Sequence, residues 1–133
     1  MERPLLIYVV EDSPTQALGV KRTLKSLQPV EVKLFSDGLE AHRAVQSCPP
    51  DLLLMDLLVP SLHGLALCRL LKFHADFQHI PVLIFSSITE VDILEQTQAA
   101  GADAFLPKPF DPEQLVSRVR KLRPELRPVE ASA

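Results

Sequence analysis

Short apolar runs alternate with intervals of helix length along most of the chain, and this alternation limits the possible folds more than any other feature. Four of the runs are continuous, whereas the run at residues 30–35 alternates apolar with polar residues. Continuous runs of about four to eight apolar residues are typical of strands buried on both faces, as in parallel sheets. The continuous runs lie at residues 5–10, 51–55, 81–85 and 102–106.

Helix signals fill the intervals between these runs. Ser13-Pro14 and Asp111-Pro112 each place a capping side chain before a proline, which is favoured at the first position of a helix. The chain has 12 prolines, and the others mark ends of elements because proline interrupts helix interiors and central strands. Strands and helices thus alternate throughout, which predicts an α/β domain of the (βα)5 type, with a parallel sheet and helices on both faces.

Two helical intervals differ in the apolar residues that they carry. In the first, apolar residues recur at helical spacing until Pro29 ends the pattern. These residues are Ala17, Val20, Leu24 and Leu27. The fourth interval, residues 89–100, begins with a capping residue, Thr89, and has only Val91 and Leu94 on its apolar side. We therefore expect the fourth helix to be the least firmly anchored.

Length, charge and hydropathy exclude several classes of protein. A length of 133 residues fits one domain, and we expect a domain of residues 1–123 with a flexible tail at 124–133. The net charge of −3 removes the phosphate attraction on which most nucleic-acid-binding domains rely. No apolar stretch approaches the roughly 18 residues of a membrane helix, and the N-terminus lacks a signal-peptide layout. We expect a cytoplasmic protein in which Cys48 and Cys68 are reduced thiols.

Acidic side chains follow two of the expected strands. Glu11 and Asp12 follow the first run, and Asp56 follows residues 51–55. The carboxyl ends of parallel strands share one edge of a sheet, so these like charges would favour a hard divalent cation. Mg2+ fits, with Asp12 and Asp56 as direct ligands and Glu11 acting through water. The alternatives are that Glu11 and Asp12 only favour a helix N-terminus and that Asp56 only caps a turn.

Residues of different chemistry follow the last two expected strands. Ser86 offers a hydroxyl group after the run at 81–85. Lys108, which stands between Pro107 and Pro109, places an ammonium group at the same edge. A metal ion and a lysine can neutralise phosphoryl oxygens, and a carboxylate can attack phosphorus. The set of strand-end residues therefore predicts a phosphoryl-binding site.

In combination these residues resemble the signature of bacterial response-regulator receiver domains, the family of the chemotaxis protein CheY. The resemblance covers about residues 4–122, and the segment at 101–110, GADAFLPKPF, is its most specific part. The residues that carry it are Glu11-Asp12, Asp56, Pro60, Gly64, Ser86 and Lys108-Pro109. It implies a doubly wound, flavodoxin-like fold with a five-stranded sheet of strand order 2-1-3-4-5.

The resemblance also implies a role for each acidic residue. Asp56 would accept a phosphoryl group from a sensor histidine kinase, from a phosphotransfer protein or from a small donor such as acetyl phosphate. Mg2+ would be bound by Glu11, Asp12, Asp56 and the backbone carbonyl of Leu58. Lys108 would pair with a phosphoryl oxygen. The domain would act only on its own phosphoryl group and would not be an enzyme for external substrates.

Ser86 and Phe105 would form the switch of such a domain. Ser86 would move to a phosphoryl oxygen, and Phe105 would turn into the vacated space, which changes the face made by the fourth helix, fifth strand and fifth helix. A downstream protein would bind this face, without direct contact to nucleic acid or a membrane. The domain would be a monomer or a phosphorylation-dependent dimer. The peptide bond between Lys108 and Pro109 is commonly cis in the family.

Four residues depart from the family pattern, and one of them is His63, which stands before Gly64 where an aspartate is often found. Glu11 replaces the commoner aspartate, and Phe105 lacks the hydroxyl group of the tyrosine often found there. Leu58 places an apolar side chain where side chains influence the access of water to the phosphoryl group, so we expect altered dephosphorylation.

Other functions remain open or are disfavoured by particular residues. A pseudo-receiver, an interaction module of the same fold that works without phosphorylation, is the alternative hypothesis. A flavin carrier is disfavoured because the acidic loop after the first strand would repel a flavin phosphate. A phosphatase of the haloacid-dehalogenase type is disfavoured because it needs a second aspartate where Leu58 stands.

Overall fold

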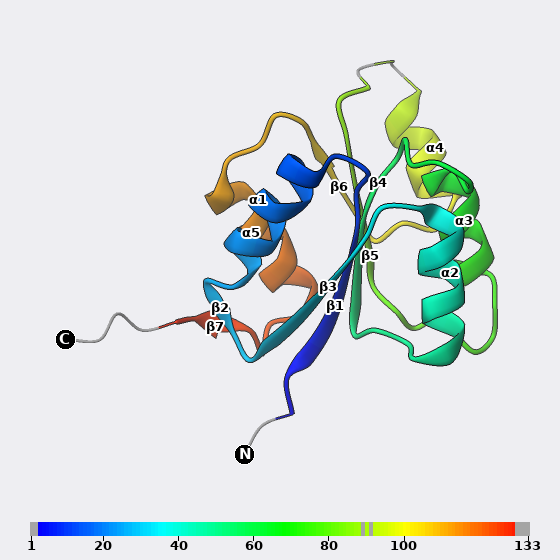
Figure 1. The fold of residues 1–133 in the computed structure, drawn as a ribbon. Helices are drawn as coiled ribbons and strands as arrows, with labels where there is room; N and C mark the ends of the chain where they lie inside the picture. Colours follow the sequence, from blue (N-terminus) through cyan, green and yellow to red (C-terminus); the bar gives the residue numbers. More distant parts are fainter. Residues whose placement is uncertain (1–2, 89, 91, 130–133) are drawn as a thin grey trace.

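A five-stranded parallel sheet forms the centre of the structure (Figure 1). The computed structural model describes residues 3–88, 90 and 92–129. The strands of this sheet are β1 (Leu5–Val10), β3 (Val30–Phe35), β4 (Leu52–Asp56), β5 (Val82–Ser86) and β6 (Ala104–Pro107). They are arranged in the order β3-β1-β4-β5-β6. This matches the predicted order 2-1-3-4-5, because the numbering differs only through a short extra strand, so the predicted fold class is confirmed.

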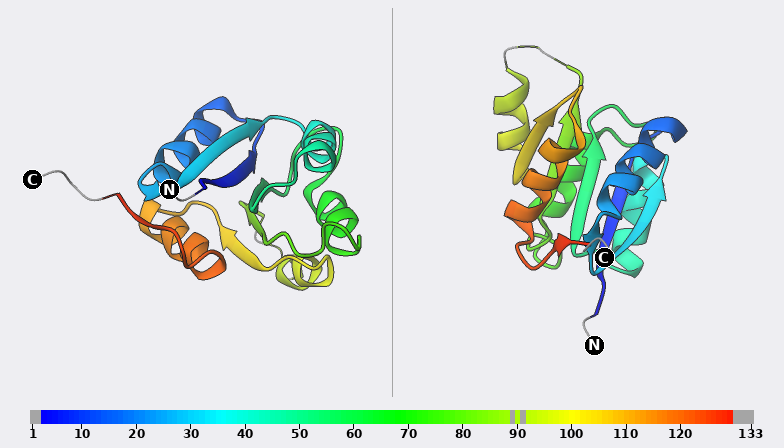
Figure 2. Two further views of the ribbon diagram at one scale, coloured as in Figure 1. Left: turned by 90° about the horizontal axis from the view of Figure 1, so that it is seen from below. Right: turned by 90° about the vertical axis from the view of Figure 1, so that its left-hand side faces the viewer.

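Helices cover both faces of the sheet. The helices found among the described residues are α1 (Pro14–Leu24), α2 (Gly38–Ser47), α3 (Gly64–Lys72), α4 (Ile93–Ala99) and α5 (Pro112–Leu122). Figure 1 shows α1 and α5 on one face and α2, α3 and α4 on the other, and the right panel of Figure 2 shows α1 and α5 in front of the sheet. Within the described residues, no helix combines the length and apolarity needed to cross a bilayer.

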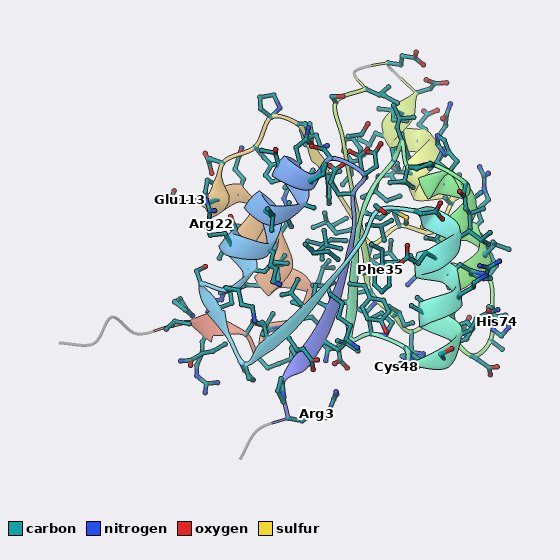
Figure 3. The ribbon with its side chains drawn as sticks, viewed as in Figure 1. Arg3, Arg22, Phe35, Cys48, His74 and Glu113 are labelled. Carbon is teal, nitrogen blue, oxygen red and sulfur yellow. The ribbon has the colours of Figure 1, made fainter. Side chains whose placement is uncertain are left out.

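The side chains of the sheet divide between two hydrophobic cores. Successive residues of a strand point to opposite faces, so Tyr8 packs in the core beneath α2, α3 and α4, whereas Ile7 packs in the core beneath α1 and α5. Every residue of β1, β4 and β5 is buried, as their continuous apolar runs predict. Figure 3 shows the side chains that fill the space between the sheet and each helical layer.

The first helix ends earlier than its apolar pattern predicts. The α1 helix ends at Leu24, and Leu27 belongs instead to a short strand, β2 (Leu27–Gln28). This strand pairs in antiparallel fashion with β7 (Arg127–Pro128). Leu27 is nevertheless buried in the core beneath α1 and α5, so its apolar character reflects burial on a strand and not the continuation of the helix.

Part of the expected tail lies against the domain. Leu126 is fully buried, and its carbonyl accepts a hydrogen bond of 3.0 Å from Nε of Arg120. The backbone N–H of Val129 donates to the carbonyl of Ser26 at 2.8 Å. The division of the chain at residue 123 stays a prediction, and residues 130–133 lie outside the described residues. Leu126 is thus buried in the domain, and the backbone of residues 127–129 lies beside the segment after α1.

The α4 helix has few buried residues. Ile93 and Thr97 are its buried side chains, whereas Leu94 is 48% exposed and does not belong to the buried side. Thr89 and Val91, from which a cap and an apolar contact were expected, lie outside the described residues.

Candidate functional site

Four neighbouring strands each place a polar residue at or just after their carboxyl end, and these residues lie at one edge of the sheet. Glu11 follows β1, Asp56 ends β4, Ser86 ends β5 and Lys108 follows β6. The backbone holds this edge together, because the N–H of Lys108 donates to the carbonyl of Ser86 at 2.8 Å. Parallel pairing in register thus brings together side chains that are far apart in the sequence.

The ammonium group of Lys108 is the centre of the site. Its Nζ donates to Oε1 of Glu11 at 2.8 Å and to Oδ2 of Asp56. A third acceptor is Oε1 of Gln16, at 2.5 Å. The ring of Phe85 lies below, with its centroid 5.2 Å from Nζ. One cation therefore joins two carboxylates and a neutral amide.

The charges of the site depend on one another. Burial raises the pKa of Glu11, although hydrogen bonds from Lys108 and from the backbone of Ser13 oppose this shift, and the nearby charge of Asp56 adds to it. For Lys108, burial would lower the pKa, but hydrogen bonds to Asp56 and Glu11 and their charges outweigh burial and raise it. Lys108 therefore stays charged, while the buried carboxylates around it repel each other.

The carboxylate of Asp56 lies at the end of a buried strand and accepts a hydrogen bond at each oxygen. Asp56 is 8% exposed, and its Oδ1 accepts a hydrogen bond of 2.9 Å from the N–H of Leu58. The side chain of Leu58 is 53% exposed. Asp12 is exposed beside Glu11, between the end of β1 and the start of α1. Both oxygens of Asp56 are oriented, one by a backbone N–H and the other by Lys108.

Ser86 and Phe105 each make a hydrogen bond outside the group of contacts around the Lys108 ammonium. The hydroxyl oxygen of Ser86 accepts from the N–H of Ile88 at 3.0 Å, and Ser86 is 1% exposed. Phe105 is half-buried against the core beneath α2, α3 and α4, and its carbonyl accepts from Nη1 of Arg118 at 2.6 Å. The peptide bond from Lys108 to Pro109 is cis.

The donor set at this edge is one of hard oxygen atoms. Among residues 3–88, 90 and 92–129, no group of three or more His, Cys, Asp or Glu side chains is arranged to hold a metal ion. The Lys108 ammonium stands between Glu11 and Asp56 instead. Carboxylate and carbonyl oxygens nevertheless suit Mg2+, and the two carboxylates of Glu11 and Asp56 with one lysine leave the cluster with an excess of negative charge. The chemistry of the residues therefore fits a magnesium ion.

Two residues of the site were not expected from the sequence. Phe85 belongs to an apolar run, and an apolar run does not show which ring will lie beneath an ammonium group. Gln16 comes three residues after the capping residue Ser13, a spacing that signals helix capping and not a contact with a distant lysine.

Known proteins resemble the chain along most of its length. The family model of the response regulator receiver domain matches residues 7–120. Response regulator MprA of Mycobacterium bovis (strain BCG / Pasteur 1173P2) is 36% identical over 126 residues, which are 95% of this chain and 54% of that protein. The chain thus spans about half the length of this curated relative.

Two solved structures have the same fold. The signal receiver domain of a signal transduction histidine kinase from Syntrophus aciditrophicus has 33% identity and a TM-score of 0.84, with 97% of each chain covered. The receiver domain of a sensor histidine kinase from Pseudomonas aeruginosa PAO1 has 25% identity and a TM-score of 0.80, over 90% of this chain and 98% of that one. That structure has a magnesium ion coordinated in its active site cleft. Since the family model covers most of the sequence and the fold agrees, the chain belongs to the response regulator receiver domains of two-component systems.

Proposed function

We propose that this chain is a phosphoacceptor, in which Asp56 accepts a phosphoryl group from a histidine kinase or a phosphotransfer protein. The observation that carries the proposal is the contact between the Lys108 ammonium and the carboxylate of Asp56 at the carboxyl edge of the sheet. A carboxylate at a strand end is a nucleophile, and a fixed cation beside it can neutralise an incoming phosphoryl group.

The transfer exchanges one bond to phosphorus for another. A carboxylate oxygen of Asp56 forms a P–O bond while the P–N bond to the donor's imidazole breaks, and the electron pair of the broken bond stays on the imidazole nitrogen. The N–H of Leu58 orients the carboxylate by its bond to Oδ1. Lys108 offsets the charge of the phosphoryl oxygens. These residues position and neutralise the reacting groups, and this is the main task in phosphoryl transfer.

Mg2+ is the cofactor that we propose for this site. Asp12, Asp56 and the backbone carbonyl of Leu58 would hold the ion directly, and Glu11 would hold it through water. When bound, the ion would neutralise phosphoryl oxygens during transfer. The oxygen donor set supports this assignment, as does the magnesium ion in the related receiver domain from Pseudomonas aeruginosa.

Phosphorylation would act on the face formed by α4, β6 and α5. The phosphoryl group adds charge and strong acceptors at Asp56, and the Ser86 hydroxyl would exchange its local contact with Ile88 for one of these acceptors. Phe105 would turn inward in response. Its carbonyl is bonded to Arg118, so a change in β6 would reach α5 directly. A downstream protein would bind this face, with the chain a monomer or a phosphorylation-dependent dimer and without direct contact to nucleic acid.

Phosphorylation by a small donor tests the proposal. The chain is incubated with acetyl phosphate and Mg2+, and intact mass and peptide mass spectrometry follow the gain of one phosphoryl group. We expect an acid-stable, base-labile modification on Asp56 that chelation of Mg2+ prevents. Asp56→Asn should abolish it. Asp76→Asn, which changes an aspartate with 79% side-chain exposure, is the matched control and should leave it unchanged.

The same experiment separates the alternative function. A wild-type chain that gains no phosphoryl group from acetyl phosphate, or from a panel of histidine kinases, would overturn the proposal. Such a result would favour the phosphorylation-independent interaction module. Amide NMR shifts of residues 86–120 test the switch separately, because they should change when Asp56 is phosphorylated and stay constant in Asp56→Asn.

A further inference from the structure

The hydrogen bonds of Lys108 use all the donors that its side chain has. A lysine ammonium carries three N–H groups, and Nζ of Lys108 contacts three acceptors, Glu11, Asp56 and Gln16. The Phe85 ring lies on another side of Nζ. Lys108 can therefore bond a phosphoryl oxygen only if it gives up one of its present partners.

The three partners differ in how readily they can be given up. Glu11 is charged and almost fully buried, and its second oxygen is held by the N–H of Ser13 at 3.1 Å. Asp56 keeps its negative charge until the P–O bond forms, so it still holds Lys108 when the phosphoryl group arrives. Gln16 is neutral, and it is exposed on α1, where water can replace its bond. A neutral acceptor binds an ammonium group less strongly than a carboxylate does, so Gln16 is the partner that Lys108 releases at least cost.

A comparison of two helix starts shows that the contact of Gln16 is not a by-product of helix capping. Gln16 and Gln114 occupy the same position, the third residue of their helices, after a capping Ser13 or Asp111. In α5 the side chain of Gln114 returns to the backbone N–H of Asp111 at 2.9 Å and closes a capping box. In α1 the N–H of Ser13 donates to Glu11 instead, and the Gln16 side chain extends to Lys108.

The surroundings of Gln16 leave room for this exchange. Gln16 and Lys108 both line a cavity of about 490 Å³ between α1 and the segment that follows β6. The Gln16 backbone is fixed, because its N–H is bonded to the side chain of Ser13 at 3.3 Å. Only the side chain of Gln16 has to rotate when Lys108 turns to a phosphoryl oxygen.

We propose that Gln16 is a positioning residue that holds the Lys108 ammonium in the unphosphorylated state and releases it to the phosphoryl group. The proposal rests on the proposed function of Asp56. Since this bond exists before transfer and is exchanged during transfer, it stabilises the ground state and slows the reaction. The strength of the acceptor at position 16 therefore sets the rate at which Asp56 is phosphorylated.

Two substitutions at one position give opposite expectations. Gln16→Met removes the acceptor, and phosphorylation by acetyl phosphate at saturating Mg2+ should become about three- to tenfold faster, the range expected for one hydrogen bond. Gln16→Glu replaces the neutral acceptor by a carboxylate, and phosphorylation should become slower by a similar factor. Met, Gln and Glu have similar helix propensities, so α1 is preserved in both variants.

Two matched controls isolate the contact with Lys108. Thr15→Glu adds the same charge at a neighbouring exposed position, so it corrects for repulsion of the anionic donor. Gln114→Met removes the corresponding side chain from the capping box of α5, and it should lower the Tm without changing the phosphorylation rate.

The outcomes separate this proposal from the one on which it rests. Faster phosphorylation of Gln16→Met than of the wild type, together with slower phosphorylation of Gln16→Glu than of Thr15→Glu, would support the role of Gln16. Rates equal to wild type, or changes of the same sign in both Gln16 variants, would overturn the role of Gln16 while leaving Asp56 as the acceptor. No phosphorylation of the wild type would overturn both.

Discussion

The ammonium group of Lys108 lies 2.8 Å from the carboxylate of Glu11, although 97 positions separate the two residues in the chain. The Glu11 side chain is 1% exposed and that of Lys108 is 17% exposed. A buried carboxylate at the end of the first strand thus depends on a cation that follows the last strand of the sheet. This pair joins the stability of the fold to the charge of the site.

Removal of the Lys108 charge should destabilise the domain. Lys108→Met leaves Glu11 and Asp56 close together without their cation, and the free energy of unfolding should fall by about 2 kcal/mol. Urea unfolding at neutral pH measures this change in the free energy of unfolding. Lys121→Met, an exposed lysine near the end of α5, is the control and should change stability by less than about 0.5 kcal/mol. Equal stability of the two variants would mean that the pair contributes nothing.

Gly19→Ala should stabilise the protein. Gly19 lies inside α1, and a Cβ atom there would meet no atom within 4 Å. Alanine loses less backbone entropy than glycine on folding, so the free energy of unfolding should rise by about 0.5–1 kcal/mol. The control is Gly64→Ala, which should destabilise because its Cβ would lie 2.9 Å from the carbonyl oxygen of Asp56. Chemical denaturation measures the change in the free energy of unfolding of both variants. A Gly19→Ala protein that is less stable than the wild type would contradict the prediction.

Leu126→Ala tests whether residues 124–129 belong to the cooperative fold. Leu126 is fully buried in the core beneath α1 and α5. Truncating a buried leucine leaves a cavity, so stability should fall by about 2–4 kcal/mol. Val129→Ala, at a side chain that is 50% exposed, should change it by less than about 0.5 kcal/mol. If Leu126→Ala unfolds at the same urea concentration as the wild type, the segment is separate from the domain.

Leu58→Asn should shorten the lifetime of the phosphorylated state. The Leu58 side chain is 53% exposed beside Asp56 and has no group that can bind water. An asparagine side chain can orient a water molecule toward the phosphoryl group, so loss of the label should become about three- to tenfold faster, or about 1 kcal/mol in activation free energy. Leu70→Asn, an exposed leucine on α3, is the control. Identical lifetimes of Leu58→Asn and wild type would remove the role of Leu58.

The free energy of unfolding should fall in acid, because Asp51 becomes protonated there and loses the contacts that its charge makes. Burial opposes ionisation of Asp51, but hydrogen bonds from Arg3 and the N–H of Leu6 outweigh it, so the pKa of Asp51 lies below its ordinary value. Figure 3 shows Arg3 next to the start of β1, at the amino-terminal edge of the sheet. Because the folded pKa is the lower one, the ionised group stabilises the fold above about pH 4, and this contribution is lost as pH falls through the folded pKa.

A substitution isolates this contribution. Asp51→Asn should be less stable than wild type at neutral pH, and the difference should shrink as pH falls from about 4 to about 2. Thermal unfolding across this range measures the difference, with Asp76→Asn as the control for loss of an exposed carboxylate. A difference that stays constant with pH would exclude Asp51 as its source.

Most of the fold could be predicted because its signals are local. The buried strands β1, β4 and β5 are short apolar runs, and helices begin where Ser13 and Asp111 cap them. The site was partly predictable for the same reason, since residues that end parallel strands must share an edge. Which of them would touch was not predictable, because contacts such as the one between Ser86 and Ile88 depend on side-chain rotamers.

The departures from prediction arise where a distant segment competes with a local signal. Leu27 continues the apolar spacing of α1, but it pairs with Pro128 in the small sheet of β2 and β7. Leu126 lies beyond α5 in a segment rich in proline and charge, but it is buried by contacts that only the folded chain supplies. Helical spacing shows that a side chain is apolar and does not show which segment will bury it.

The sequence by itself determined the alternation of strands and helices, the helix caps and the set of strand-end residues, because each depends on neighbours in the chain. The tertiary structure alone decided how the charges are paired. It places Lys108 between Glu11 and Asp56, and it brings the side chain of Gln16 to the ammonium group and not to the backbone N–H of Ser13. A buried ammonium group must satisfy all its donors, and its acceptors come from whichever elements the folded chain brings within reach.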